Sequence, residues 1–148
     1  KWRMKLQQHA LRLSCLLALN FLSGCASTPN AVDSKYVFSQ YEQVDQFNPR
    51  RMQNWQSIDQ QSLIVETSRN SSYLLILRRP MRDLRSENSI EFSSNSGTVH
   101  AKFDQLVVRT HSVGFGADPA SAQIHSIYKL KSKDDVKAVK KQIASDWW

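Results

Sequence analysis

The sequence is poor in the residues that mark several common classes of protein. Its 148 residues include only two cysteines, four glycines and four prolines. So few glycines and prolines exclude a collagen-like or low-complexity chain, and 41% hydrophobic residues exclude a disordered tail. No stretch approaches the roughly 20 apolar residues of a spanning helix, so we expect no polytopic membrane protein. The length fits one modest domain.

Acidic residues are missing from the first part of the chain. Lys1, Arg3, Lys5 and Arg12 are basic, and the first acid is Asp33. Removing these four from the 20 basic residues leaves 16 against 13 acidic ones, so the remainder has a net charge of +3. A nucleic-acid-binding domain needs a basic surface interleaved with stacking aromatic residues, so we expect no nucleic-acid partner.

The basic stretch is followed by an apolar run and a lipid-attachment pattern. Residues 13–23 (LSCLLALNFLS) are mostly apolar, and the pattern ends with Leu22, Ser23, Gly24 and Cys25. This order predicts a lipoprotein signal peptide at 1–24, whose lipobox presents the Cys25 thiol to a diacylglyceryl group. The alternative is a buried core helix with Cys25 as an ordinary small apolar residue.

Residue 26 and the expected acylation of Cys25 predict where the protein resides. Residue 26 is Ala and not Asp, so we expect sorting to the outer membrane of a Gram-negative bacterium, on its periplasmic face. Acyl chains on Cys25 would anchor the chain to the membrane. Cys15 leaves with the leader and Cys25 carries lipid, so the mature domain has no thiol for a disulfide, metal or nucleophile. We expect no cofactor and no metal.

Small polar residues follow the cysteine. They predict a lipidated Cys25 with a flexible tether at 25–35 and a single globular domain at 36–148. Helical spacing of apolar residues predicts a helix over 36–47, although Tyr36, Val37 and Phe38 favour a strand. Residues 50–55 are expected to add a helical turn that brings Trp55 to the core.

Strand patterns occupy the middle of the chain. Residues 62–67 and 72–78 predict a hairpin buried on both faces. Residues 90–92, a turn at 95–97 and residues 98–109 predict a second hairpin, with Val99, Ala101 and Phe103 on one face. A long loop at 110–121 precedes a closing strand at 122–130.

A C-terminal helix completes the predicted fold. Ser132 and Asp135 form a capping-box pattern, and Val136, Val139 and Ile143 form an apolar stripe. The fold class is therefore α+β and mainly β. We expect a small antiparallel sheet of about four to six strands with the C-terminal amphipathic helix packed on it.

Several motifs together resemble a known family. They are W-x3-D at 55–59, YLL-x-L at 73–77, RP at 79–80, FD at 103–104 and I-x2-IY-x-L at 124–130. This succession resembles an uncharacterised family of small Gram-negative bacterial lipoproteins, a domain of unknown function, over about 44–130. The resemblance implies a cysteine after the proline and another before the Ile-x-x-Ile run. Those places hold Met81 and Ala122, so the implied disulfide is absent.

No catalytic motif is present. His100, His111 and His125 lack metal-ligand spacing, so isolated surface histidines are the simpler interpretation. Asp104 lies at a strand bend and is expected to bind turn N–H groups. A rival hypothesis is a small periplasmic hydrolase or transferase that uses Asp104 with His100 or His111.

One basic cluster stands out. Arg78, Arg79, Arg82 and Arg85 lie within eight residues and could bind an anionic oxygen pair, although a solvated turn is the simpler interpretation. We therefore expect a membrane-anchored, non-catalytic envelope accessory or binding module. Its partner would be an envelope protein, lipopolysaccharide or peptidoglycan. A third possibility is purely structural packing at the membrane surface, which predicts no defined pocket.

Overall fold

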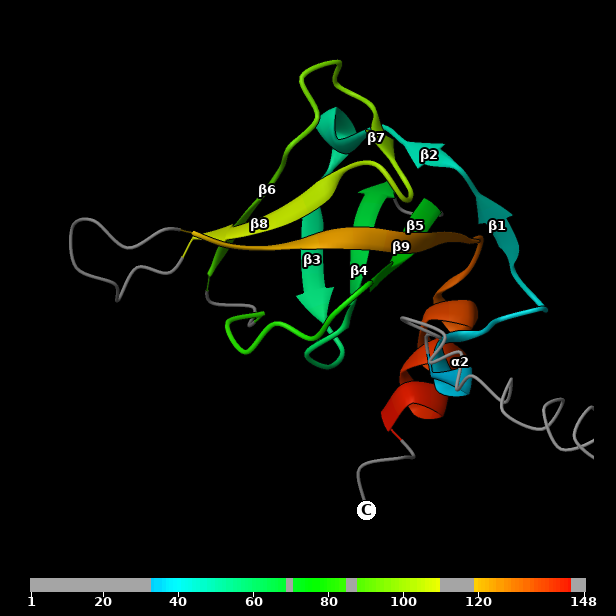
Figure 1. Ribbon diagram of the computed structural model, residues 1–148. Coiled ribbons are helices and arrows are strands. Elements are labelled where there is room, and N and C mark those ends of the chain that lie inside the picture. Colours follow the sequence, from blue (N-terminus) through cyan, green and yellow to red (C-terminus); the bar gives the residue numbers. More distant parts are fainter. Residues whose placement is uncertain (1–32, 69–70, 85–87, 110–118, 145–148) are drawn as a thin grey trace, which may run out of the picture. The chain divides into compact units, whose positions relative to one another are not determined.

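The computed structural model describes residues 33–68, 71–84, 88–109 and 119–144 (Figure 1). The chain divides into two units, Lys1–Ala31 and Val32–Trp148, and all described residues belong to the second. That unit is mainly β, with one C-terminal α-helix among its described residues.

Seven strands form one antiparallel sheet. Six of them follow the order β3-β4-β5-β9-β8-β6 (Figure 1). Their bounds are β3 Asn54–Ser57, β4 Ser62–Ser68, β5 Ser71–Leu77, β6 Ser89–Phe92, β8 Gln105–Arg109 and β9 Ala120–Leu130. The seventh, β1 (Glu42–Val44), pairs with β9. The expected antiparallel sheet with a C-terminal helix is confirmed.

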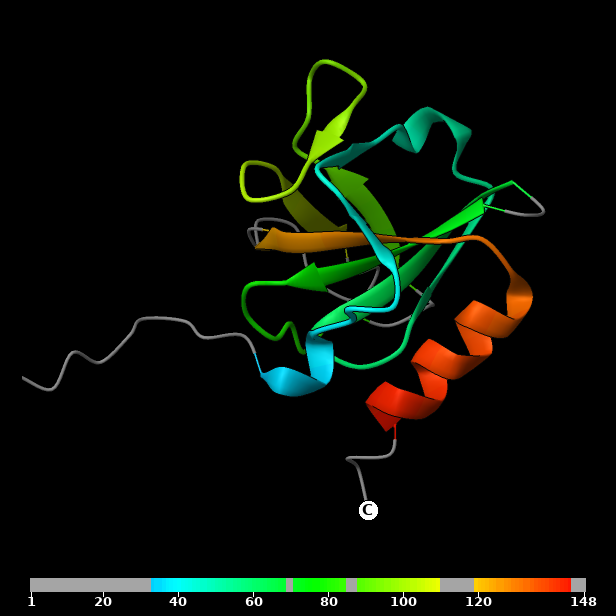
Figure 2. The same cartoon turned by 90° about the vertical axis from the view of Figure 1, so that its right-hand side faces the viewer.

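Strand β9 is the centre of the sheet. One edge pairs with β5 from Ile124 to Leu130. The other edge pairs with β8 near its start and with β1 near its end, at Ile127–Lys129. The predicted closing strand at 122–130 is therefore the middle strand, with neighbours on both edges. Figures 1 and 2 show that the sheet is curled, with β9 as one of the strands of its wall.

The sheet is buried on both faces in its middle. Leu63, Val65, Leu75 and Leu77 point into a cluster inside the curl, together with Met81 and Ala122 among others. Ile64, Leu74 and Ile76, which alternate with them, point into a second cluster. The expected hairpin with two-sided burial is confirmed, with strands β4 and β5 paired in antiparallel register.

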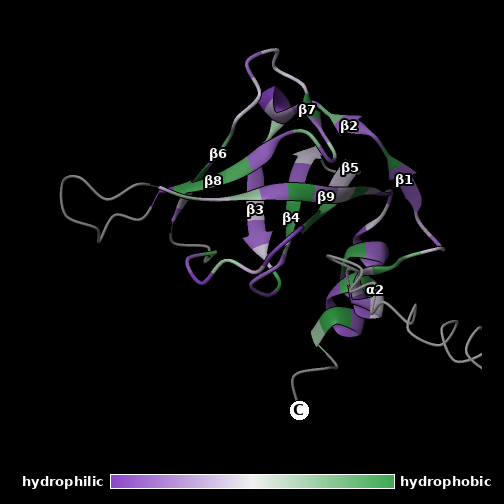
Figure 3. Ribbon diagram, viewed as in Figure 1, coloured by the Kyte–Doolittle hydropathy of each residue, from purple (hydrophilic) through white to green (hydrophobic). Residues whose placement is uncertain are grey.

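Helix α2 (Lys133–Ala144) covers the second cluster. Val139 and Ile143 are fully buried there, and Val136 is partly buried. The predicted capping box is present: Asp135 N–H donates to Ser132 Oγ at 3.1 Å, and Ser132 N–H donates to Asp135 Oδ2 at 3.0 Å. Hydrophobic and hydrophilic residues share the helix in Figure 3, as an amphipathic helix requires.

The helix predicted over 36–47 is wrong. The chain forms a short 3-10 helix, η2 (Ser34–Tyr36), then β1 and β2 (Gln46–Phe47). Residues 36–38 form no strand either, because Tyr36 ends η2, but their burial alternates: Tyr36 and Phe38 are buried while Val37 is exposed. The helical turn expected at 50–55 is shorter and begins earlier, as the 3-10 helix η3 (Pro49–Arg51). Trp55 lies half-buried in β3 and packs against the core cluster, as expected.

The strand expected over 98–109 is interrupted. The chain forms β7 (Val99–His100), which pairs with β2, then a turn, then β8. Val99 and Ala101 are buried, but Phe103 is 82% exposed, so the expectation that these three share a face is wrong. Lys102 has a left-handed backbone with φ of 69°, which breaks the alternation. The turn predicted at 95–97 is confirmed, with Gly97 at φ 76°.

Candidate functional site

The candidate site is a basic surface on one part of β9, formed by Arg78, Arg79, Lys102, Gln123 and His125. We call it the β9 surface. Arg78 and Arg79 directly follow β5, and Lys102 lies in the turn between β7 and β8. Backbone hydrogen bonds hold both segments to β9: Arg78 N–H donates to Gln123 O at 2.8 Å, and Lys102 N–H donates to Ile124 O at 2.7 Å. Residues far apart in the sequence thus meet across this strand.

Gln123 joins the two basic segments through its side chain. Its Oε1 accepts a hydrogen bond from Arg78 Nη1 at 2.8 Å, and its Nε2 donates to the Lys102 carbonyl. Arg79 Nη2 donates to the Ser121 carbonyl at 2.6 Å. The amide therefore uses one acceptor and one donor to connect both flanks of β9.

A β-bulge places His125 in this surface. Ile76 pairs with Ser126, but the next residue of β5, Leu77, pairs with Ile124, so His125 is the extra residue on β9. Burial lowers the pKa of His125, and the positive charges of Arg78 and Lys102 lower it further. The imidazole is thus a neutral group beside two cations at neutral pH.

Within the part of the chain that the structure describes, the cations of this surface have no carboxylate partner. Among the described residues, the ion pairs of basic side chains are Lys35–Asp59, Arg109–Glu91, Lys131–Glu42, Lys137–Asp134 and the His100–Asp104 contact. Arg78, Arg79 and Lys102 belong to none of these pairs and are exposed. Their charge is therefore available to an external anion.

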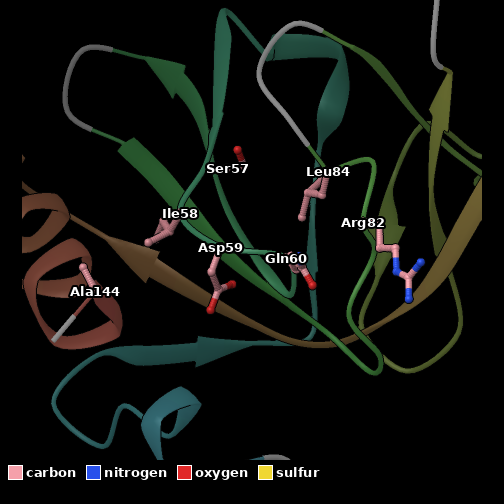
Figure 4. Close-up of a pocket in the computed structure, with 7 residues that line it drawn as sticks. All are labelled: Ser57, Ile58, Asp59, Gln60, Arg82, Leu84 and Ala144. Atoms are coloured by element: carbon pink, nitrogen blue, oxygen red, sulfur yellow. The ribbon is translucent and has the colours of Figure 1, made fainter. Parts of the chain in front are cut away.

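The predicted arginine cluster separates in space. Arg78 and Arg79 lie on the β9 surface, whereas Arg82 lines a cavity of about 310 Å³ (Figure 4). Arg85 lies outside the described residues. The cavity is also lined by Ser57, Ile58, Asp59, Gln60, Leu84 and Ala144.

The carboxylate at this cavity is engaged within the fold. Asp59 is buried and accepts hydrogen bonds from the Tyr36 hydroxyl and the Ser62 hydroxyl, both at 2.6 Å, and from Gln61 N–H at 2.9 Å. Lys35 Nζ lies 3.7 Å from its Oδ2. Asp59 therefore connects η2 to the turn between β3 and β4, and this contact gives the W-x3-D motif a structural meaning.

His100 and Asp104 are in contact. His100 Nδ1 lies 3.3 Å from Asp104 Oδ2, and the same oxygen accepts from His100 N–H at 2.7 Å. Asp104 Oδ1 accepts from the Ser93 hydroxyl at 3.3 Å. The predicted role of Asp104 in binding a turn N–H group is confirmed. His111, the other histidine of the rival hypothesis, lies outside the described residues.

The remaining sequence-based expectations concern the lipobox, a metal site and a membrane-spanning helix. Leu22, Ser23, Gly24 and Cys25 lie outside it. Where the chain is described, no three His, Cys, Asp or Glu side chains gather as a metal site would require. No helix in those same ranges has the length and hydropathy to span a bilayer.

Comparison with known proteins identifies a family. The model of a family of unknown function, DUF6491, matches residues 8–146. The chain belongs to this family. The match extends beyond the segment 44–130 on which the sequence resemblance is based, and it includes both the β9 surface and the Asp59 cavity. No curated protein and no solved structure matches the chain.

Sequence patterns could find only half of this surface. Arg78 and Arg79 belong to an obvious cluster, but Lys102 and Gln123 are single polar residues without a motif. These residues come together only because β9 pairs with both β5 and β8, and the pairing of β9 with β5 joins segments far apart in the sequence. The strand alternation around His125 also hides the bulge, since a bulge is visible only when the partner strand is known.

Proposed function

We propose that the protein is a lipoprotein of a Gram-negative outer membrane. Cys25 would carry the acyl chains, and the domain would face the periplasm. The proposal is supported by the basic flank, the short apolar run and the Leu22–Cys25 pattern at its end. Mass spectrometry of the native protein tests it, because an unmodified Cys25 thiol or a retained leader would contradict it.

We further propose that the domain is a non-catalytic binding module for anionic groups of the envelope. The observation that carries this proposal is the set of exposed cations on the β9 surface, which have no carboxylate partner in the ranges that the structure describes. Gln123 restricts Arg78 before any ligand arrives, which lowers the entropy lost on binding. Guanidinium groups suit phosphate and carboxylate oxygens. Lipopolysaccharide and peptidoglycan both carry such groups.

The test compares two triple variants with equal loss of charge. In one, Arg78→Gln, Arg79→Gln and Lys102→Gln remove the cations of the β9 surface. In the control, Lys133→Gln, Lys137→Gln and Lys141→Gln remove exposed lysines of α2. The full lipidated chain, purified in detergent, is pelleted with lipopolysaccharide aggregates or peptidoglycan sacculi.

We expect retention on at least one of the two materials to weaken by roughly fivefold per charge removed from the β9 surface, because each cation near an anionic surface contributes about 1 kcal/mol. The α2 variant is expected to bind like the wild type. Retention should also decrease with added salt. Equal retention of both triple variants would contradict an anion site on β9.

A second candidate function is a small periplasmic hydrolase or transferase. It is favoured by one observation, the 3.3 Å contact between His100 Nδ1 and Asp104 Oδ2, since a carboxylate that orients an imidazole is a common catalytic arrangement. Both Asp104 oxygens already accept hydrogen bonds within the fold, one from His100 N–H and one from the Ser93 hydroxyl, which favours the binding proposal. Turnover of chromogenic esters or phosphodiesters that is lost in both His100→Gln and Asp104→Asn would reverse this preference.

A further inference from the structure

A large aromatic side chain is exposed beside the β9 surface. Phe103 is 82% exposed, whereas Phe38 and Phe47 are at most 3% exposed. Its neighbours in the turn are Lys102, which belongs to the β9 surface, and Asp104. A single exposed apolar residue is common, so exposure alone does not indicate a partner. The backbone and the charges around Phe103 supply further evidence.

The turn that carries Phe103 is anchored on several sides. Ala101 N–H donates to Asp45 O at 2.8 Å, and Lys102 N–H donates to Ile124 O. Asp104 N–H closes the turn on His100 O at 3.0 Å. Lys102 has the left-handed backbone that non-glycine residues rarely adopt. The turn thus presents Phe103 outward and keeps a strained lysine next to it.

The chemistry of this region suits an anionic bilayer. An aromatic ring gains free energy in the headgroup region, and neighbouring cations are attracted to lipid phosphates. Arg78, Arg79 and Lys102 provide such cations within the same surface as the turn. An exposed apolar residue next to a lysine, on a surface that carries further exposed basic side chains, is the combination that peripheral membrane contacts use.

The predicted anchor would keep this surface near a membrane. Only seven residues lie between Cys25 and Asp33, the first described residue, and the eight Cα–Cα steps from one to the other span about 28 Å when fully extended. In Figure 2 the start of the described chain (blue) and the turn between β7 and β8 (yellow-green) both lie toward the left-hand side of the domain, the turn above β9 and the start of the chain below it. A short tether at this side favours contact between the turn and the bilayer.

We infer that the turn at 101–104 docks on the anionic bilayer to which the chain is anchored, with Phe103 in the headgroup region and Arg78, Arg79 and Lys102 against lipid phosphates. The inference rests on the proposed lipid anchor and anion-binding surface. It deepens that proposal by naming the phosphates of the bilayer as the ligand.

The experiment uses the lipidated full chain in nanodiscs. One set contains phosphatidylcholine alone, and the other contains phosphatidylcholine mixed with phosphatidylglycerol. Amide hydrogen exchange of residues 99–106 is followed by mass spectrometry. We expect severalfold slower exchange in the anionic discs. Phe103→Ser, and separately the pair Arg78→Gln and Arg79→Gln, should restore the rate seen in the neutral discs.

Two matched controls make the result specific. Val37→Ser removes the other exposed large hydrophobic side chain of the described residues and should leave the protection unchanged. The pair Lys137→Gln and Lys141→Gln removes equal charge from α2 and should also leave it unchanged. Protection that is identical in both kinds of disc, or that survives Phe103→Ser, would overturn the inference.

A second measurement covers the case in which exchange in the turn is already slow. Phe103→Cys introduces a free thiol into a mature chain whose Cys25 is lipidated, and an apolar environment-sensitive dye is attached there. Its emission should shift to the blue in anionic discs and not in neutral ones. The same dye on Lys137→Cys should not respond. Absence of a shift at position 103 would contradict docking.

Failure of docking and failure of anion binding can be separated. If pelleting with lipopolysaccharide or peptidoglycan depends on the β9 cations but the nanodisc signals do not respond, the surface binds another envelope anion and docking is wrong. If neither assay depends on these cations, both proposals are wrong. Loss of docking in Phe103→Ser with unchanged pelleting would support both.

Discussion

The Tyr36 hydroxyl donates a hydrogen bond of 2.6 Å to Asp59 Oδ2 and thereby fixes η2 to the turn between β3 and β4. The two residues are 23 positions apart in the sequence and both are buried. The same carboxylate accepts bonds from Ser62 and Gln61, so it is shared between the N-terminal segment and the sheet.

Removing the Tyr36 hydroxyl should destabilise the domain. Tyr36→Phe deletes a hydrogen bond to a charged group, so we expect the free energy of unfolding to fall by about 1.5–3 kcal/mol. Tyr41→Phe is the matched control, because the Tyr41 hydroxyl makes a long hydrogen bond to the Asp135 carbonyl, at 3.5 Å, and none to a carboxylate among the described residues. Urea denaturation measures both. Equal stability of the two variants would show that the bond to Asp59 contributes little.

Loss of the helix cap should have a smaller effect. Ser132→Ala leaves Asp135 N–H without its side-chain acceptor, and we expect a loss of about 1 kcal/mol in unfolding free energy. Ser89→Ala, an exposed serine at the start of β6, should change stability by less than about 0.5 kcal/mol. A thermal unfolding series compares the two, and an unchanged midpoint for Ser132→Ala would contradict the capping interpretation.

Replacing Lys102 with glycine should relieve the left-handed backbone conformation and stabilise the domain, but weaken anion binding. A left-handed conformation costs a residue with a side chain about 1–2 kcal/mol, and glycine avoids most of this cost. We therefore expect Lys102→Gly to unfold at equal or higher denaturant concentration than the wild type, whereas Lys102→Val should be less stable. Both variants should bind anionic material more weakly. A clearly destabilised Lys102→Gly would show that the lysine side chain supports the turn.

His125 should make stability depend on pH. Its pKa is lowered in the folded state by burial and by Arg78 and Lys102, so the unfolded chain binds the proton more readily. The contribution to stability is therefore full above the ordinary histidine pKa of about 6.5 and is lost as the pH falls through that value. It levels off below the folded-state pKa.

His125→Asn should remove this part of the pH dependence. Denaturation midpoints of the variant and of the wild type, each expressed as the change from its own value at neutral pH, should diverge in the acidic range, because only the wild type loses the His125 contribution. A bound anion would raise the pKa of His125, so anion binding should strengthen on mild acidification in the wild type alone. Identical pH profiles for the two proteins would contradict the environment assigned to His125.

Local patterns predicted much of this fold. The hairpin of β4 and β5, the short strand β6 and helix α2 with its cap follow from signals within a few residues, such as alternating apolar positions and the Ser132–Asp135 pair. The helix prediction for residues 36–47 was wrong because helical spacing of apolar residues and a strand preference overlap there. The pairing of β1 with β9 decides the outcome, and residues 42–44 give no local sign of a partner 85 positions later.

The site was less accessible to prediction than the fold. Clustering in the sequence joined Arg82 to Arg78 and Arg79, but the chain turns after Leu77 and sends Arg82 to the Asp59 cavity. Lys102 and Gln123 reach the surface through a turn with positive φ and a bulged strand. Both features are consequences of tertiary pairing and have no signature in a single sequence.

The position of β9 also constrains the order in which the domain can assemble. It is the last strand in the sequence, yet β5, β8 and β1 all require it as a neighbour. A chain still emerging from a translocation channel would therefore hold three unpaired strand edges until residues 120–130 had passed. Native contacts of such long sequence separation slow folding, so a chaperone that shields β edges would have a defined interval in which to act.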